Sequence, residues 1–244
     1  MAGHSKWANI QHRKSRQDSK RAKVFTKMAK EITVAAKMGG PDPDANPRLR
    51  AAIAAARKIS MPGDNIKRAI DKSTAADAAT LEEIHYEGYG PAGTAFIVEC
   101  LTDNRNRTAG EIRSIFSKAG GNMGESGSVA WQFDKKGYLT SPKGERSEDD
   151  VTEICLEVGG EDIEDGGEFW AFISAPEDLH AVRDALEEQG LEVESAKWEM
   201  LPQNHIQVEG ETLEKVMRLM EKLDDCDDVQ NVWNNADFDE AALS

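Results

Sequence analysis

Apolar residues recur every three or four positions between residues 18 and 39, which predicts a helix with one buried face. The members of this face are Ala22, Phe25, Ala29, Ile32 and Ala36. Lysines follow a second face of the same helix, at Lys20, Lys23, Lys27, Lys30 and Lys37. Gly39-Gly40-Pro41 is typical of a helix end, because glycine terminates a helix and proline cannot continue it.

Two shorter helices are expected next, over about 47–60 and 64–72, with Met61-Pro62-Gly63 between them. The pattern therefore predicts a bundle of three helices at 18–74. Residues 1–17 show no core-facing apolar stripe, and we interpret them as a basic arm carrying one aromatic residue, Trp7. The polar, alanine-rich stretch 73–82 is expected to be a linker.

Strand and helix patterns alternate in the rest of the chain. Ile84–Tyr89 and Thr94–Thr102 are predicted strands, and the Gly90–Gly93 segment between them is typical of a hairpin. Thr108 and Glu111 have the spacing of a capping box that opens a helix. Ser128–Phe133 is expected to be a strand.

The order of elements from 137 to 201 is β-α-β-β-α-β, if Asp162–Glu164 is a short strand. The flanking segments form two further β-α-β halves, of which the second has strands expected at His205–Glu209 and Val229–Trp233 and a helix at Glu211–Leu223. We therefore predict an α+β fold: an N-terminal three-helix domain followed by two ferredoxin-like α/β sandwiches, one inserted in the other. The expected limits are 1–17 for the arm, 18–74 for the bundle, 82–134 plus 202–238 for the first sandwich and 135–201 for the inserted one.

Composition narrows the class of protein. The chain has 244 residues, of which 39% are hydrophobic and 31% charged, as in globular proteins. Its apolar runs are far shorter than the roughly 20 residues that a membrane span needs. No secretory signal follows Met1, and Cys100, Cys155 and Cys226 are too few and too scattered for a disulfide framework. We expect a cytoplasmic protein without a membrane partner.

The net charge of −15 hides a strong asymmetry. Residues 1–74 contain 17 Lys and Arg against 6 Asp and Glu, a net charge of +11. The remaining residues contain 13 against 39, a net charge of −26, and the two parts add up to −15. Such segregation indicates one part that attracts a polyanion and another that repels it.

The basic part therefore predicts contacts with a nucleic-acid backbone, where each neutralised phosphate releases counterions. Trp7 is a candidate to stack on a base or to wedge into a groove. The alternatives are a merely solvated helix face or an arginine-rich transit peptide. The candidate residues are His4, Lys6, Trp7, Asn9, Arg13, Lys14, Arg16, Lys20, Arg21, Lys23, Lys27, Lys30, Arg48, Arg50, Arg57, Lys58, Lys67 and Arg68.

A second candidate contact comprises two loops at the ends of the helix that contains Ile112. The segments are 102–108 and 120–127, in which arginines could reach phosphates and glycines let backbone amides approach a ligand. Ordinary turn chemistry is the alternative. The candidate residues are Asn104, Arg105, Arg107, Asn122 and Met123.

Catalytic and metal-binding patterns are missing from the sequence. The five histidines have no ligand spacing with one another or with cysteine, and no nucleophile elbow occurs. Asp42, Asp44 and Asn46 imitate a calcium loop, but Pro47 stands where glycine is required. Four aspartates around Cys226 are expected to form a solvated acidic turn. We expect no enzymatic activity, cofactor, metal or small-molecule substrate.

Several motifs together span nearly the whole chain. They are Met1-Ala2-Gly3-His4-Ser5-Lys6-Trp7-Ala8-Asn9-Ile10, Gly39-Gly40-Pro41-Asp42-Pro43, Met61-Pro62, Tyr86-Glu87-Gly88-Tyr89-Gly90-Pro91, Thr102-Asp103-Asn104, Asn106-Arg107-Thr108 and Gly127-Ser128-Val129-Ala130-Trp131. These motifs resemble the YebC/PmpR family. The resemblance implies a three-domain bacterial cytoplasmic protein. Family members are described as DNA-binding transcriptional regulators.

The family also implies a second role. A mitochondrial relative activates translation of a cytochrome oxidase subunit, and bacterial members are tied to the ribosome at proline-rich stretches. Two hypotheses follow: a transcriptional regulator that binds promoter DNA, or a ribosome-associated factor that binds ribosomal or transfer RNA.

Overall fold

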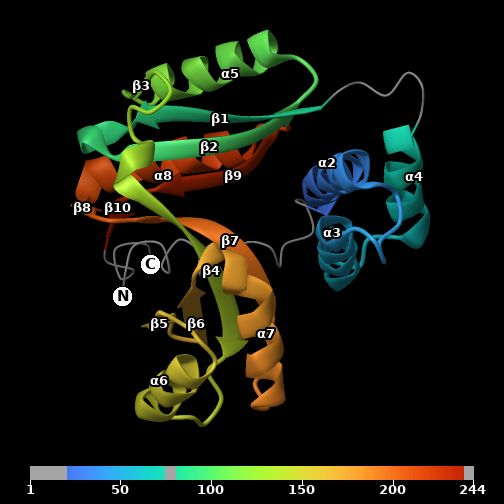
Figure 1. Cartoon of the computed structure of the whole chain (residues 1–244). Helices are drawn as coiled ribbons and strands as arrows, with labels where there is room; N and C mark the ends of the chain where they lie inside the picture. The colour runs from blue at the N-terminus through green and yellow to red at the C-terminus, as the bar shows by residue number, and fades with distance from the viewer. Residues whose placement is uncertain (1–20, 75–80, 239–244) are drawn as a thin grey trace.

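The fold is given by a computed structural model that describes residues 21–74 and 81–238. Figure 1 shows three parts. A helical domain (residues 21–74) lies beside the junction of two sandwiches, each consisting of a sheet and two helices. Sandwich A is built around the sheet of β1, β2, β3 and β9, and sandwich B around the sheet of β4, β5, β6 and β7.

The helical domain consists of α2 (Arg21–Gly39), α3 (Pro47–Lys58) and α4 (Gly63–Thr74), close to the ranges predicted from periodicity. Its apolar core includes Ile32, Leu49 and Ile66. The buried side chain of Asn46 joins the first two helices. Asn46 accepts a hydrogen bond from the Leu49 amide at 3.0 Å, which caps α3, and its Nδ2 donates to the carbonyl oxygens of Ala35 and Gly40, both at 2.8 Å.

Sandwich A has the strand order β3-β1-β2-β9. Helices α5 and α8 cover one face of this sheet, where Phe96 and Val98 pack with Ile112, Phe116 and Val216. The elements are β1 (Glu82–Tyr89), η2 (Pro91–Gly93), β2 (Ala95–Thr102), α5 (Arg105–Lys118), β3 (Asn122–Met123), α8 (Gly210–Asp224) and β9 (Val229–Asn234).

Sandwich B has the strand order β5-β6-β4-β7, the order of a ferredoxin-like sheet. Its helices α6 and α7 pack on one face through Val151, Val182 and Leu186. The elements are β4 (Phe133–Pro142), α6 (Glu148–Glu157), β5 (Asp162–Asp165), β6 (Phe169–Ser174), η4 (Pro176–Asp178), α7 (Leu179–Glu188) and β7 (Ser195–Pro202). The predicted fold class, a helical domain followed by two α/β sandwiches of which one is inserted in the other, is confirmed. The ferredoxin-like strand order, which was expected for both sandwiches, is found in sandwich B but not in the β3-β1-β2-β9 sheet of sandwich A.

The insertion enters and leaves sandwich A through neighbouring strands. β4 and β7 pair antiparallel from Phe133 opposite Pro202 to Thr140 opposite Ser195. Around the base of this pair, Ile97 and Trp233 of sheet A pack with Phe133, and Trp198 and Met200 lie against them. The two sandwiches therefore share an apolar junction.

Three local predictions were wrong. The helix expected to begin at a Thr108–Glu111 capping box begins earlier, because Asn104 caps α5 by accepting from the Arg107 amide at 3.1 Å. Segment 128–133 is mainly the 3₁₀ turn η3 (Ala130–Gln132) rather than a strand. The strand expected near residue 206, β8 (Ile206–Gln207), pairs with β10 (Ala236–Asp237) in a separate two-stranded sheet.

Candidate nucleic-acid interface

Three candidate lysines of α2 point at the body of the protein. Lys23, Lys27 and Lys30, here called the lysine row, follow one another at spacings of four and three residues and therefore share a helix face. Each forms an ion pair with the turn after α8, residues 224–228, here called the acidic turn. The distances from Nζ to Oδ1 are 3.0 Å for Lys23 to Asp225, 2.8 Å for Lys27 to Asp224 and 2.7 Å for Lys30 to Asp228.

The expectation that the acidic turn is simply solvated was therefore wrong. Its carboxylates serve as partners for a helix about 200 residues earlier in the chain. The sequence contained a signal for this contact: four aspartates within five residues, and lysines at helical spacing in another segment. Charge patterning within each segment alone did not connect them, because the pairing depends on the tertiary fold.

Asp228 is the innermost member of this contact. Its side chain is only 9% exposed and accepts from Lys30, from Arg107 at 2.9 Å and from the Thr108 hydroxyl at 2.7 Å. Burial alone would raise the pKa of Asp228, but these hydrogen bonds and charges outweigh it and hold the pKa well below its ordinary value. Asp228 also accepts from the Thr102 hydroxyl at 3.2 Å, and it thereby joins α2, the end of β2 and the start of α5.

Two cations of α3 also contact the sandwiches. Arg48 pairs with Glu31 of α2 at 2.8 Å and with Glu83 of β1 at 3.1 Å. Lys58 donates to the backbone carbonyls of Val193 and Glu194 in sandwich B. The helical domain is thus attached to both sandwiches through charged side chains, and its apolar core cluster contains residues of the helical domain alone.

The remaining described candidates of α3 and α4 are exposed to solvent. Arg50 and Arg68 make hydrogen bonds only to nearby groups of their own helix or its preceding loop. Neither they nor Arg57 and Lys67 have an ion pair with a described carboxylate, and the same holds for the exposed Lys72. These five cations, here called the outer basic set, are available to a partner.

The candidates His4, Lys6, Trp7, Asn9, Arg13, Lys14, Arg16 and Lys20 lie outside the described residues. Arg21 is the first residue of α2.

The two candidate loops stand at opposite ends of α5, a helix of 14 residues and about 21 Å at 1.5 Å per residue. Arg107 is held by Asp103 and Asp228, both at 2.9 Å, while Asn104 is used as a cap and Arg105 is exposed. Asn122 and Met123 pair with Tyr89 and Gly88 at the edge of sheet A. The structure does not bring the two loops together into one surface.

The second loop is organised by Glu87, which the sequence interpretation did not select as a site residue. Its buried carboxylate accepts backbone amide hydrogen bonds from Gly127, Val129 and Ala130, at 2.7, 2.7 and 2.8 Å. These contacts fix the segment that presents Trp131, a residue that is 66% exposed. Trp131 is therefore a candidate stacking residue that was missed, although its motif was recognised.

His85 lies close to Glu83 and Glu99, with one ligand atom from each within 4.8 Å of the others. The β1–β2 register places His85 opposite Glu99, a grouping that spacing along the chain did not reveal. Glu83 pairs with Arg48, and the neighbouring Glu99 raises the pKa of His85 through hydrogen bonding and charge, against the effect of burial. We interpret the cluster as two ion pairs.

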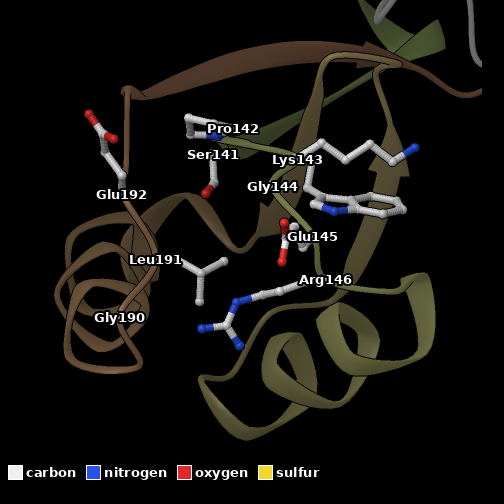
Figure 2. A pocket seen from close by; sticks show the side chains of 10 residues that line it. Ser141, Pro142, Lys143, Gly144, Glu145, Arg146, Gly190, Leu191 and Glu192 are labelled. Carbon is white, nitrogen blue, oxygen red and sulfur yellow. The ribbon is translucent and has the colours of Figure 1, made fainter.

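A small pocket of about 180 Å³ lies at the end of β4 that is distant from sheet A, between the loops 141–146 and 190–192 (Figure 2). Its polar side chains have opposite charges: Lys143 and Arg146 against Glu145 and Glu192. Lys143 is paired with Asp165 at 2.6 Å. This mixture gives no preference for a polyanion, so we assign the pocket no part in the interface.

Comparisons with known proteins agree with this architecture. A family model described as "TACO1/YebC protein N-terminal domain" matches residues 5–76, and one described as "TACO1/YebC second and third domain" matches residues 81–236. The crystal structure of a conserved hypothetical protein from Aquifex aeolicus superposes with a TM-score of 0.86 at 43% identity, covering 93% of this chain and 94% of that chain. In the described part of the chain, no helix has the length and apolarity to cross a membrane.

Curated relatives match over nearly their full lengths. One from Desulfatibacillum aliphaticivorans is 52% identical over 244 residues, covering 100% of this chain and 99% of the relative. One from Koribacter versatilis is 51% identical over 244 residues, covering 100% and 98%. Both have the name "Probable transcriptional regulatory protein". Because the two models together match nearly all of the sequence, the chain belongs to the TACO1/YebC family.

Proposed function

We propose that this protein is a nucleic-acid-binding regulator, and specifically a DNA-binding transcriptional regulator. In this proposal the outer basic set and the basic segment before α2 contact the phosphate backbone. The names of the curated relatives support a regulatory role in transcription. All three cysteines are buried and unpaired, and burial raises the pKa of each thiol, which suits a reducing cytoplasm.

The observation that carries the proposal is the exposure of the outer basic set. In a chain of net charge −15, five exposed cations of α3 and α4 have no ion pair with a described carboxylate. Exposed cations gathered on one small domain attract a polyanion, and release of condensed counterions provides the binding free energy. The acidic sandwiches repel the same polyanion and so orient the helical domain towards it.

The test is a variant of the outer basic set, Arg57→Gln with Lys67→Gln and Lys72→Gln. If each cation meets a phosphate, the slope of log K against log salt for duplex DNA should flatten by about 2.7, and affinity at low salt should fall. A matched control, Arg113→Gln with Lys118→Gln and Lys215→Gln, removes the same charges from α5 and α8. Equal losses in both variants would show a general charge effect and contradict the assignment.

The partner nucleic acid needs a separate experiment. Cross-linking in cells, followed by sequencing of the bound DNA and RNA, should recover promoter DNA if the protein regulates transcription. Recovery of ribosomal or transfer RNA, together with RNase-sensitive co-sedimentation with ribosomes, would contradict the transcriptional hypothesis and support a ribosome-associated factor.

A further inference from the structure

We infer that the acidic turn competes with nucleic acid for the lysine row. Its carboxylates pair with the three lysines and keep them from binding phosphates until a phosphate backbone displaces the turn. The inference rests on the proposed function, since it assigns a regulation to the same domain. In the closed state seen in the structure, the described part of the helical domain offers the outer basic set, while the lysine row is paired with the acidic turn. In the open state it would also offer Lys23, Lys27 and Lys30.

The lysine row has the chemistry and spacing of a backbone contact. Its ammonium groups lie on one helix face, with Cα positions that advance by about 6.0 and 4.5 Å at 1.5 Å per residue. Each group is now within 3.0 Å of a carboxylate oxygen. Phosphate oxygens accept the same charge-assisted hydrogen bonds, so a phosphate backbone can take the places of these carboxylates.

The contact is of a kind that can open. The hydrophobic cluster of the helical domain does not merge with those of the sandwiches, and ion pairs and hydrogen bonds to carbonyl groups span the joint. Interfaces of this type are weakened by salt and by competing ions. The two sandwiches, in contrast, share the apolar junction around Trp233 and stay together.

The exposure of the three ion pairs decreases from Lys23 to Lys30, which indicates where phosphates begin to replace the carboxylates. Lys23 and Asp225 are 47% and 51% exposed, Lys27 and Asp224 20% and 32%, and Lys30 and Asp228 20% and 9%. Solvent-exposed pairs contribute little free energy and exchange readily. A polyanion therefore meets Lys23 and Lys27 first, and Lys30 last.

The experiment neutralises the two outer carboxylates with Asp224→Asn and Asp225→Asn and leaves Asp228 intact. We expect about tenfold tighter binding of a short DNA duplex at low salt and a salt slope steeper by up to about two, because two further cations meet phosphates. The matched control is Asp149→Asn with Glu153→Gln on α6, which changes the net charge equally on exposed carboxylates of sandwich B. The control should bind like the unmodified chain.

A double-mutant cycle separates competition from a general charge effect. Lys27→Gln should change the affinity for the duplex less than twofold in the unmodified chain, because Lys27 is already paired with Asp224 there. In the Asp224→Asn, Asp225→Asn background it should weaken binding about threefold, as expected for coupled residues. Circular dichroism confirms the fold of each variant, and small-angle scattering should show a larger radius of gyration for the neutralised turn than for the control.

The outcomes distinguish the two proposals. If the unmodified chain binds duplex and the neutralised variant binds with the same affinity and slope as the control, the internal competitor is excluded and the proposed function stands. Additive effects in the cycle would exclude it in the same way. If no variant binds DNA or RNA, both proposals are overturned.

Discussion

Among single residues, the buried carboxylates do most to define this structure. Glu87, Glu99, Glu199 and Asp228 are each buried, and hydrogen bonds or ion pairs compensate each for the loss of solvent. Glu87 accepts from backbone amides, and Glu99 contacts Asn231 and His85. Glu199 contacts Trp233 and Lys197, and Asp228 contacts Lys30. A charge taken out of water is tolerated only when its oxygens are fully hydrogen-bonded. These residues therefore fix positions that apolar packing leaves open.

Glu87→Gln tests this role. The substitution keeps the shape of the side chain but removes the charge that three amides donate to, and it places an NH₂ group among donors. We expect the free energy of unfolding to fall by about 2 kcal/mol, the range for hydrogen bonds to charged groups. Urea titration measures it, with the exposed Glu82→Gln as control. A loss below about 0.5 kcal/mol, the level of an ordinary surface change, would contradict the role.

The chemistry of the candidate residues could be predicted from the sequence, but their partners could not. Lysine spacing correctly placed Lys23, Lys27 and Lys30 on one face of α2. Their ion pairs with Asp225, Asp224 and Asp228 join residues about 200 positions apart in the sequence, and local patterns contain no information about such contacts. For the same reason Glu87 looked like an ordinary strand residue.

At the scale of elements, periodicity was the reliable signal, because helix and strand periods are imposed by which face packs against the core. Helix α8 and strand β9 begin and end within a residue or two of their expected positions. The start of α5 was misplaced because Asn104 and Thr108 both have capping side chains. The fold decides between them, since the Thr108 hydroxyl is taken by Asp228.

Substitutions at the start of α5 distinguish the observed cap from the predicted one. Asn104→Ala should lower the free energy of unfolding by about 1 kcal/mol, the usual effect of losing an N-cap. Glu111→Ala, which would disrupt a capping box at Thr108, should change it by less than about 0.5 kcal/mol. Chemical denaturation of both variants provides the comparison, and the reverse order of effects would restore the capping-box assignment.

At the scale of the whole molecule, Asp228 connects parts that otherwise have separate cores. Its folded-state pKa lies below the ordinary value of about 3.9, so its charge stabilises the folded state above about pH 4. That stabilisation is lost as the pH falls through the folded-state pKa. Protonation of Asp228 thus weakens the joint between the helical domain and sandwich A.

Asp228→Asn should therefore destabilise the protein at pH 7 by about 3 kcal/mol, since it leaves Lys30 and Arg107 without their buried partner. The difference from the unmodified chain should shrink as the pH is lowered below about 4. Urea unfolding at pH 7, 5 and 3.5 measures it, with the exposed neighbour Asp227→Asn as control. A difference that is the same at every pH would show that the Asp228 charge is not responsible.

The paired strands at the base of sandwich B also have a mechanical consequence. Because Phe133 lies opposite Pro202, the two ends of sandwich B are adjacent, so tension along the chain loads sandwich B only after sandwich A has yielded and then pulls these ends apart across the ladder. β4 and β7 would then separate like a zipper, one residue pair after another, rather than shear along their length. The first pairs to part are those beside the apolar junction, so the ladder opens from that end before the helices α6 and α7 are disturbed.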